Sequence, residues 1–194
     1  AGTQNAGIIF GGLNKTCTEE YNGSAFSAGG ALIDDRMNNE AGVGTQNAAA
    51  TAGGSTPTAI SCHEAYDGVS WSVRTPLISV NLFTNQQGSQ DYFVKMGGQT
   101  PTVVADSEEW NGVSWTVTGN MITATRIGMG SGNANAALNT SGLAPAVTTT
   151  TEEYTKNYIT NPIANYCLRP GIYNAVTGLC DAEASQTLVG VTDF

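Results

Sequence analysis

Paired acidic residues are the first features of this chain that could do chemistry. Adjacent glutamates stand at Glu19-Glu20, Glu108-Glu109 and Glu152-Glu153. Carboxylates that converge with carbonyl oxygens can bind Ca²⁺, but no Asp/Asn/Gly calcium loop surrounds these pairs. Because neighbouring residues of a strand point to opposite faces, we expect one glutamate of each pair to point to solvent. We therefore predict no metal site at the acidic pairs.

The neighbouring residues Cys62 and His63 are a second candidate, since a histidine can activate a thiol. Successive residues of a strand point to opposite faces, however, which separates these two side chains. His63 is also the one histidine of the chain, so a histidine-based metal centre cannot be built from it alone. We interpret His63 as a polar residue at the start of a strand and predict no catalytic, metal or cofactor site.

Charge and hydropathy exclude two classes of partner. The net charge is −9, and only seven basic residues are scattered along the chain, whereas a nucleic-acid surface needs clustered Lys and Arg. No stretch of about eighteen apolar residues occurs, so we expect no membrane insertion. The chain also lacks the basic start and apolar run of a signal peptide, and it opens in the middle of a repeated phrase. We therefore expect it to be part of a longer polypeptide or a processed product.

The elements that would position these residues repeat along the sequence. GTQNA occurs at Gly2 and Gly44, GSQDY follows at Gly88 and GNANA at Gly132, in steps of 42, 44 and 44 residues. A glycine pair comes after each of the first three phrases, and the weaker copy SG comes after the fourth. Such a fixed period indicates a repeat architecture, in which each unit needs its neighbours to complete a core.

Aromatic residues keep the same period. A first aromatic follows the glycine pair in every unit, at Tyr21, Tyr66, Trp110 and Tyr154. A second lies five residues further on in three units, at Phe26, Trp71 and Trp115. Because identical phrases should take identical places in stacked sheets, we predict that Tyr21, Tyr66 and Trp110 form one buried column and Phe26, Trp71 and Trp115 another.

The local sequence favours strands throughout. Apolar runs such as IIFGG end in glycines that permit positive φ, and no stretch keeps the apolar spacing of an amphipathic helix. Asn22-Gly23, Asp67-Gly68 and Asn111-Gly112 favour two-residue hairpin turns. The sequence thus predicts an all-β protein of four repeats with about four short strands each.

A unit of about 44 residues has the size of one propeller blade. The apolar strand ending in Gly-Gly, followed by two spaced aromatics, resembles the kelch family, and the wording GTQNA…GG…EEYNGSAF is similar to kelch-like repeats in structural proteins of marine tailed phages. The resemblance implies propeller blades over residues 1–160, with units near 1–43, 44–87, 88–131 and 132–160. These four could close alone, belong to a larger propeller, or be completed by neighbouring subunits.

The resemblance also raises two enzyme classes, and the residues favour neither. Galactose oxidase shares the kelch fold, but its copper is held by histidines and tyrosines, and His63 stands alone here. DGVSW resembles the Asp-box turn of sialidases, but its spacing is one residue short and the arginines are too scattered for a carboxylate-binding cluster.

The repeat stops before residues 161–194, which we interpret as a C-terminal docking segment. Cys167 and Cys180 bracket a loop with the turn signals Pro170-Gly171 and Thr177-Gly178, so we predict a disulfide between these cysteines. We predict no bond between Cys17 and Cys62, because equivalent positions of successive blades lie about 10 Å apart. The tail is expected to contact a neighbouring subunit or domain.

These observations favour a protein that acts by assembly and recognition, without catalysis. The phage-like wording predicts a virion component, such as a fibre, decoration or tail-associated protein. Its partners would be other virion proteins, copies of itself or host-surface glycans. The alternatives are a carbohydrate-binding adhesin of a bacterial surface, or the non-catalytic part of a glycan-cleaving enzyme, at the cell surface or secreted.

Overall fold

The structure is a computed structural model, and it describes residues 1–13, 15–37, 41–144, 146–156, 173–174 and 179–180. Every regular element within these residues is a β-strand, which confirms the all-β prediction. The chain divides into a unit of residues 1–156 and a second unit of residues 157–194. In the second unit β16 (Tyr173–Asn174) pairs antiparallel with β17 (Leu179–Cys180). No helix in the described residues has the length and apolarity to cross a membrane.

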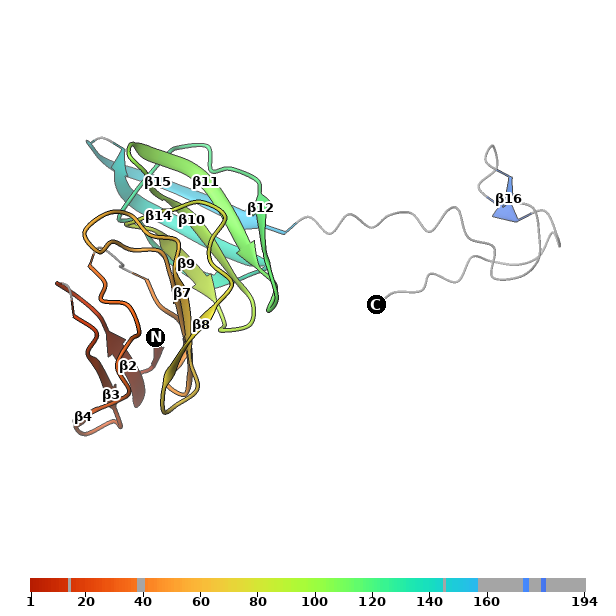
Figure 1. Ribbon diagram of the computed structural model, residues 1–194. Helices are drawn as coiled ribbons and strands as arrows, with labels where there is room; N and C mark the ends of the chain where they lie inside the picture. Colours follow the sequence, from red (N-terminus) through yellow and green to blue (C-terminus); the bar gives the residue numbers. More distant parts are fainter. Residues whose placement is uncertain (14, 38–40, 145, 157–172, 175–178, 181–194) are drawn as a thin grey trace. The chain divides into compact units, whose positions relative to one another are not determined.

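Four antiparallel sheets make up residues 1–156, and we call them blades 1 to 4. They follow one another along the colours of Figure 1, from red to cyan. Blade 1 contains β1 (Gly2–Thr3), β2 (Ala6–Phe10), β3 (Thr18–Tyr21) and β4 (Phe26–Ala28). Blade 2 contains β5 (Val43–Thr45), β6 (Ala48–Ala52), β7 (His63–Tyr66) and β8 (Trp71–Arg74). Blade 3 contains β9 (Asn85–Gly88), β10 (Phe93–Gln99), β11 (Val103–Trp110) and β12 (Trp115–Thr118). Blade 4 contains β13 (Met129–Asn133), β14 (Ala136–Ala144) and β15 (Ala146–Thr155).

The strands of each blade pair in the order of the sequence, and the four sheets follow one another as propeller blades do, each packed against the next. Equivalent residues take equivalent registers, since Tyr21 lies opposite Phe26, Tyr66 opposite Trp71, and Trp110 opposite Trp115. The repeated phrase that marked each predicted unit lies at the end of the blade's first strand. Blades 3 and 4 therefore begin about three residues before the predicted unit boundaries.

The glycine pairs hold the end of each unit against its own blade. The second glycine of each pair donates its N–H to a carbonyl of the returning chain: Gly12 to Arg36, Gly54 to Asn81 and Gly98 to Thr125. In the third pair, Gly97 has a φ of +59°, and a Cβ there would lie 2.3 Å from the Thr125 carbonyl oxygen. A side chain at that position would collide with backbone, which explains why the repeat retains glycine.

The hydrophobic core is divided into layers between successive blades. The layer between blades 1 and 2 contains Ile8, Leu32, Ala49, Tyr66 and Trp71. The layer between blades 2 and 3 contains Val43, Ala50, Ala52, Leu77, Phe93, Trp110 and Trp115. The layer between blades 3 and 4 contains Val94, Met96 and Ala137, with Met121 and Tyr154 packed against it. The face of a blade that carries its two aromatics therefore points toward the preceding blade.

The six aromatics of the two predicted columns differ in burial. Tyr66, Trp71, Trp110 and Trp115 are buried. Tyr21 is half-buried and Phe26 is 57% exposed, so burial of Phe26 was a wrong prediction. The reason is positional: the aromatic face of blade 1 points away from blade 2, and no preceding blade covers it within the described residues.

The turns after the first aromatics are longer than predicted. Four residues, Asn22 to Ala25, join β3 to β4, where the sequence had predicted a two-residue turn. The Asn22 side-chain oxygen accepts hydrogen bonds from the backbone N–H groups of Ser24 and Ala25, each at 3.0 Å. Asp67 and Asn111 make the same bonds in blades 2 and 3. The Asn/Asp-Gly sequence therefore provides a side-chain brace as well as a glycine with positive φ.

Two predictions about the tail lie outside the described residues. Cys167 falls within a range that the structure leaves undescribed, so the predicted Cys167–Cys180 disulfide remains a prediction. The docking role of residues 161–194 has the same standing.

Candidate functional site

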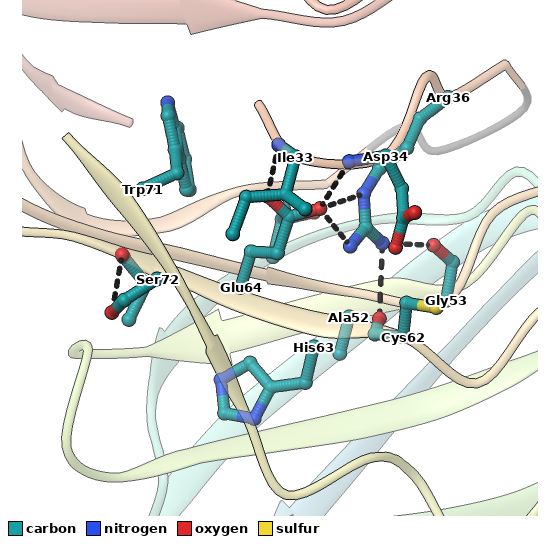
Figure 2. Close-up of polar contacts among 12 residues, drawn as sticks. Ile33, Asp34, Arg36, Ala52, Gly53, Cys62, His63, Glu64, Trp71 and Ser72 are labelled. Atoms are coloured by element: carbon teal, nitrogen blue, oxygen red, sulfur yellow. Dashed lines mark hydrogen bonds and ion pairs between the residues drawn. The ribbon is translucent and has the colours of Figure 1, made fainter. Parts of the chain in front are cut away.

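The repeated glutamates accept hydrogen bonds between blades. Glu64, on β7 of blade 2, is completely buried and accepts backbone N–H bonds from Ile33 at 2.7 Å and Asp34 at 3.3 Å (Figure 2). Both donors lie in the loop that ends unit 1. The carboxylate thus joins one blade to the unit before it, and we call this contact a carboxylate bridge.

The same bridge occurs at the next two contacts. Glu108 of blade 3 accepts from Ile78 at 2.8 Å and Ser79 at 3.1 Å. Glu152 of blade 4 accepts from Ile122 at 2.6 Å and Thr123 at 2.8 Å. The three glutamates thus occupy equivalent positions in their blades. Their donors lie in equivalent loops, each of which ends the preceding unit, 30 or 31 residues earlier in the chain.

The first bridge contains a buried arginine as well. Arg36 donates to Glu64 Oε1 from Nε at 3.2 Å and from Nη2 at 2.7 Å, and both side chains are buried (Figure 2). Its Nη1 donates to the carbonyls of Gly53 and Cys62. A buried ion pair is tolerated when its remaining donors and acceptors are satisfied, as they are here.

The second glutamate of a pair is also used between blades. Tyr66 of blade 2 donates its hydroxyl hydrogen to Glu20 of blade 1, and Tyr154 of blade 4 donates to Glu109 of blade 3 at 3.2 Å. Burial and the neighbouring Glu20 carboxylate raise the pKa of Tyr66. Glu109 is buried together with Glu108, so the prediction that one glutamate of each pair points to solvent was wrong for this pair. Blade 3 packs against blade 2 on one face and against blade 4 on the other, so its alternating strand buries both side chains.

Glutamines make a second repeated contact. Gln46 of blade 2 donates its amide hydrogens to the carbonyls of Gly7 and Tyr21 in blade 1, at 3.1 and 2.9 Å. Gln90 of blade 3 donates to the equivalent carbonyls of blade 2. Each glutamine belongs to the repeated phrase, which explains why the phrase recurs.

His63 lies in the aromatic layer between blades 2 and 3. Its ring is completely buried, with edge-to-face contacts to Phe93, Trp110 and Trp115 at centroid distances of 5.4, 4.7 and 5.4 Å. Nδ1 lies 3.1 Å from the Thr75 carbonyl oxygen. Burial lowers the pKa of His63 to about 4, and the hydrogen bond to the Thr75 carbonyl opposes this shift without reversing it. The interpretation as a polar residue at the start of a strand was therefore incomplete, because His63 is a neutral core residue.

Cys62 lies next to the first bridge and is a poor nucleophile. Burial and the neighbouring Asp34 carboxylate raise the pKa of its thiol, which keeps it protonated at neutral pH. Cys62 and Cys17 are both free cysteines. His63 and Cys62 do not form a catalytic pair, because the imidazole lies between blades 2 and 3 and the thiol faces the Arg36 side (Figure 2).

Two hollows lie between blades 3 and 4, and neither has the features of an active site. The first, of about 200 Å³, includes Met96, Asn139, Glu152 and Tyr154 among its lining residues. It is smaller than the usual 300–1,000 Å³ of a ligand pocket, and its Glu152 carboxylate already accepts two backbone bonds. The second, of about 510 Å³, is lined by Val103, Ile122, Thr123, Ala124 and Ala144, none of which can titrate. Among the described residues, no three His, Cys, Asp or Glu side chains come together as metal ligands would.

Several residues of these contacts were missed in the sequence. The partner loops carry a weak repeat of their own, because Ile33, Ile78 and Ile122 are spaced 45 and 44 residues apart. That spacing could have marked these loops as part of the repeat, although it does not show which groups they bond. Arg36 has no counterpart at the same step in units 2 and 3, where Asn81 and Thr125 stand, so no repeat signal marks it.

Comparisons with known proteins identify the fold. No protein-family model matches the chain, and no curated protein matches it in sequence. Among solved structures, the kelch-repeat protein YjhT superposes with a TM-score of 0.62 at 14% identity, covering 73% of this chain and 50% of YjhT. The chain thus has a kelch-like propeller fold and spans half the length of YjhT. At that identity the likeness concerns the fold alone.

Proposed function

We propose that this protein acts without catalysis, as a rigid row of blades that presents loops for recognition and assembly. The observation that carries the proposal is that the side chains which could act in catalysis are buried in structural contacts. Glu64, Glu108 and Arg36 are buried in contacts between blades, and His63 is enclosed by aromatic rings. Side-chain catalysis needs a positioned acid, base or nucleophile that a substrate can reach.

The braced turns are the features best suited to recognition. Each is held by its own Asn or Asp side chain, and the turns of blades 2 and 3 carry a highly exposed valine, Val69 at 75% and Val113 at 77%. The Thr75 hydroxyl donates to the Val113 carbonyl at 3.2 Å, which ties the turn of blade 3 to the preceding blade. Rigid loops lose little conformational entropy on binding, so such a row suits a large partner.

The finer form of the proposal is a virion component of a tailed phage. Its support is the repeat wording, GTQNA…GG…EEYNGSAF, which resembles structural proteins of marine tailed phages. The partners would be other virion proteins, copies of the chain or glycans of a host surface. The location would be the virion.

A bacterial adhesin that binds carbohydrate is the second candidate. Sugars stack on exposed aromatic rings, but Trp71, Trp110 and Trp115 are all buried. Phe26 and Tyr92 are the large aromatics exposed by more than half among the described residues, and they belong to different blades. The burial of the tryptophans favours the virion component over the adhesin.

Localisation and binding test the proposal together. Antibodies against residues 1–156 should label particles purified from a culture that carries the gene, in immunogold electron microscopy. Label on cell surfaces with bare particles would favour the adhesin. The purified chain should leave host-surface glycans intact, and hydrolysis of a glycan would contradict the absence of catalysis.

Substitutions at the turns test which surface is used. Val69→Lys with Val113→Lys should abolish binding of the purified chain to particles or host cells. Val147→Lys is the matched control, because Val147 is equally exposed on β15, outside the turns. Equal binding by all three proteins would remove the turns from the recognition surface.

A further inference from the structure

The face of blade 1 that points away from blade 2 consists of positions that other blades bury. Ile9 is 55% exposed, while Lys95 at the same register of blade 3 is completely buried. Phe26 is 57% exposed, while Trp71 and Trp115 at the same register are buried. This face thus has the composition of an interior contact without a blade against it.

Polar groups of this face are also unmatched. Glu19 stands at the register of Glu64 and Glu108, but it is exposed and makes no side-chain hydrogen bond within the described residues. Gln4 stands in the repeated phrase where Gln46 stands, and it too is exposed without such a bond. At the equivalent positions of blades 2 and 3, the glutamate and the glutamine each bond to the preceding unit.

On the face of blade 4 turned away from blade 3, two residues are less buried than their counterparts in blade 3. Leu138 is half-buried, whereas its counterpart Val94 in blade 3 is completely buried. Glu153 is exposed, whereas its counterpart Glu109 is buried and accepts the hydroxyl of Tyr154. In the described residues this face has no following blade.

The interior contacts obey a matching rule at the first aromatic. Where the earlier blade has a glutamate, the later blade has a tyrosine that donates to it, as in Glu20 with Tyr66 and Glu109 with Tyr154. Where the earlier blade has an alanine, Ala65, the later blade has a tryptophan, Trp110, which has no hydroxyl to donate.

The two open faces satisfy the same rule toward each other. Blade 4 ends the row with a glutamate, Glu153, and blade 1 begins it with a tyrosine, Tyr21. Gln4 would reach the carbonyls of Ala137 and Tyr154, which stand at the registers of Gly7 and Tyr21. If blade 4 had an alanine at this position, as blade 2 has in Ala65, the Tyr21 hydroxyl would meet no carboxylate.

We propose that a second copy of this chain docks head to tail, with blade 4 of each copy against blade 1 of the other. Two such contacts are identical, so a pair of copies with four blades each closes a ring of eight blades. Heterologous contacts form closed rings when their rotation permits, and eight blades lie within the range of known propellers. This inference is independent of which partner the braced turns recognise.

Oligomeric state is the first test. Sedimentation velocity and light scattering of the full chain should give twice the 20.0-kDa mass of one copy. A monomer at every concentration would overturn the proposal. The two faces would then be covered by another segment of the chain or by a further blade of a longer polypeptide.

Complementation of two variants tests the head-to-tail geometry. Phe26→Asp damages the face of blade 1, and Leu138→Asp damages the face of blade 4, so each variant alone should be monomeric. In an equimolar mixture, blade 4 of the Phe26→Asp copy meets the undamaged blade 1 of the Leu138→Asp copy. The mixture should therefore recover a species of twice the single-chain mass.

Two controls keep the result interpretable. Val117→Asp changes an exposed valine on β12 of blade 3, outside both open faces and outside the braced turns, and should remain dimeric. Circular dichroism should show the same β-sheet spectrum for all variants, because Phe26 is exposed and Leu138 is only half-buried. Folded variants that dimerise alone, or that fail to dimerise when mixed, would contradict the head-to-tail contact.

Discussion

The contact between blades 2 and 3 and the contact between blades 3 and 4 use the same backbone positions with different side chains. In the first, Trp110 and Trp115 enclose His63, and Phe93 completes the layer. In the second, the buried layer consists of Val94, Met96 and Ala137, and a hollow of about 200 Å³ remains beside it.

The two contacts agree in their carboxylate bridges. Glu108 and Glu152 each accept two backbone N–H bonds from the loop that ends the preceding unit. Backbone donors do not depend on the loop's side chains, so the bridge survives changes of sequence around it. The comparison teaches that the bridge sets how blades align, while the apolar filling varies from one contact to the next.

Removal of an aromatic should have the largest effect where the layer is thickest. Trp115→Ala should lower the free energy of unfolding by about 3–5 kcal/mol, since it deletes a buried ring and its bond to the Thr75 carbonyl. Tyr154→Ala, in the thinner contact, should cost about 2 kcal/mol. Urea denaturation of both variants measures the difference, and equal losses would show that the two contacts are energetically alike.

Acid should weaken the contact between blades 2 and 3 specifically. The pKa of His63 is lowered to about 4 in the fold, from 6.5 in the unfolded chain, so the unfolded state binds the extra proton between these values. Stability should therefore rise with pH across this window, and lowering the pH from about 6.5 to 4 should cost about 3 kcal/mol. The test is the difference in pH dependence between the native chain and His63→Gln. Parallel profiles would mean that His63 titrates normally.

The smallest effect is expected beside the hollow between blades 3 and 4. Gly119 lines that hollow, and a Cβ there would meet no atom within 4 Å. Gly119→Ala should therefore stabilise the protein by about 0.5 kcal/mol, because the unfolded chain loses conformational freedom. Gly97→Ala is the matched control and should destabilise, since its Cβ would collide with the Thr125 carbonyl. Thermal unfolding of both variants distinguishes these signs.

The period of the sequence predicted the fold class because it records the backbone. Glycine pairs and aromatics recur where every blade needs positive φ or a large buried ring. The roles of Gly97 and Trp115 could therefore be predicted from the repeat. Burial was less predictable, because it depends on neighbours in space. Phe26 and Trp71 occupy the same register, yet only Trp71 has a preceding blade against it.

The polar contacts were the least predictable part. A single chain shows that glutamates recur, but it does not show that their partners are backbone N–H groups 30 or 31 residues earlier. Arg36 has no counterpart in units 2 and 3, so the repeat could not identify it as a functional residue. His63 was interpreted only as a polar residue at the start of a strand, because an isolated polar side chain in a sequence carries no sign of the aromatic rings around it.

Hydrogen exchange at the loop amides tests the carboxylate bridges most directly. The amides of Ile33, Ile78 and Ile122 lie outside the strands, yet each donates to a glutamate, so all three should be protected in the native chain. Glu108→Ala should remove protection at Ile78 and its neighbour Ser79 while leaving Ile33 and Ile122 protected. Unchanged protection at Ile78 in that variant, measured by residue-resolved NMR, would contradict the assignment of these glutamates as the groups that join the blades.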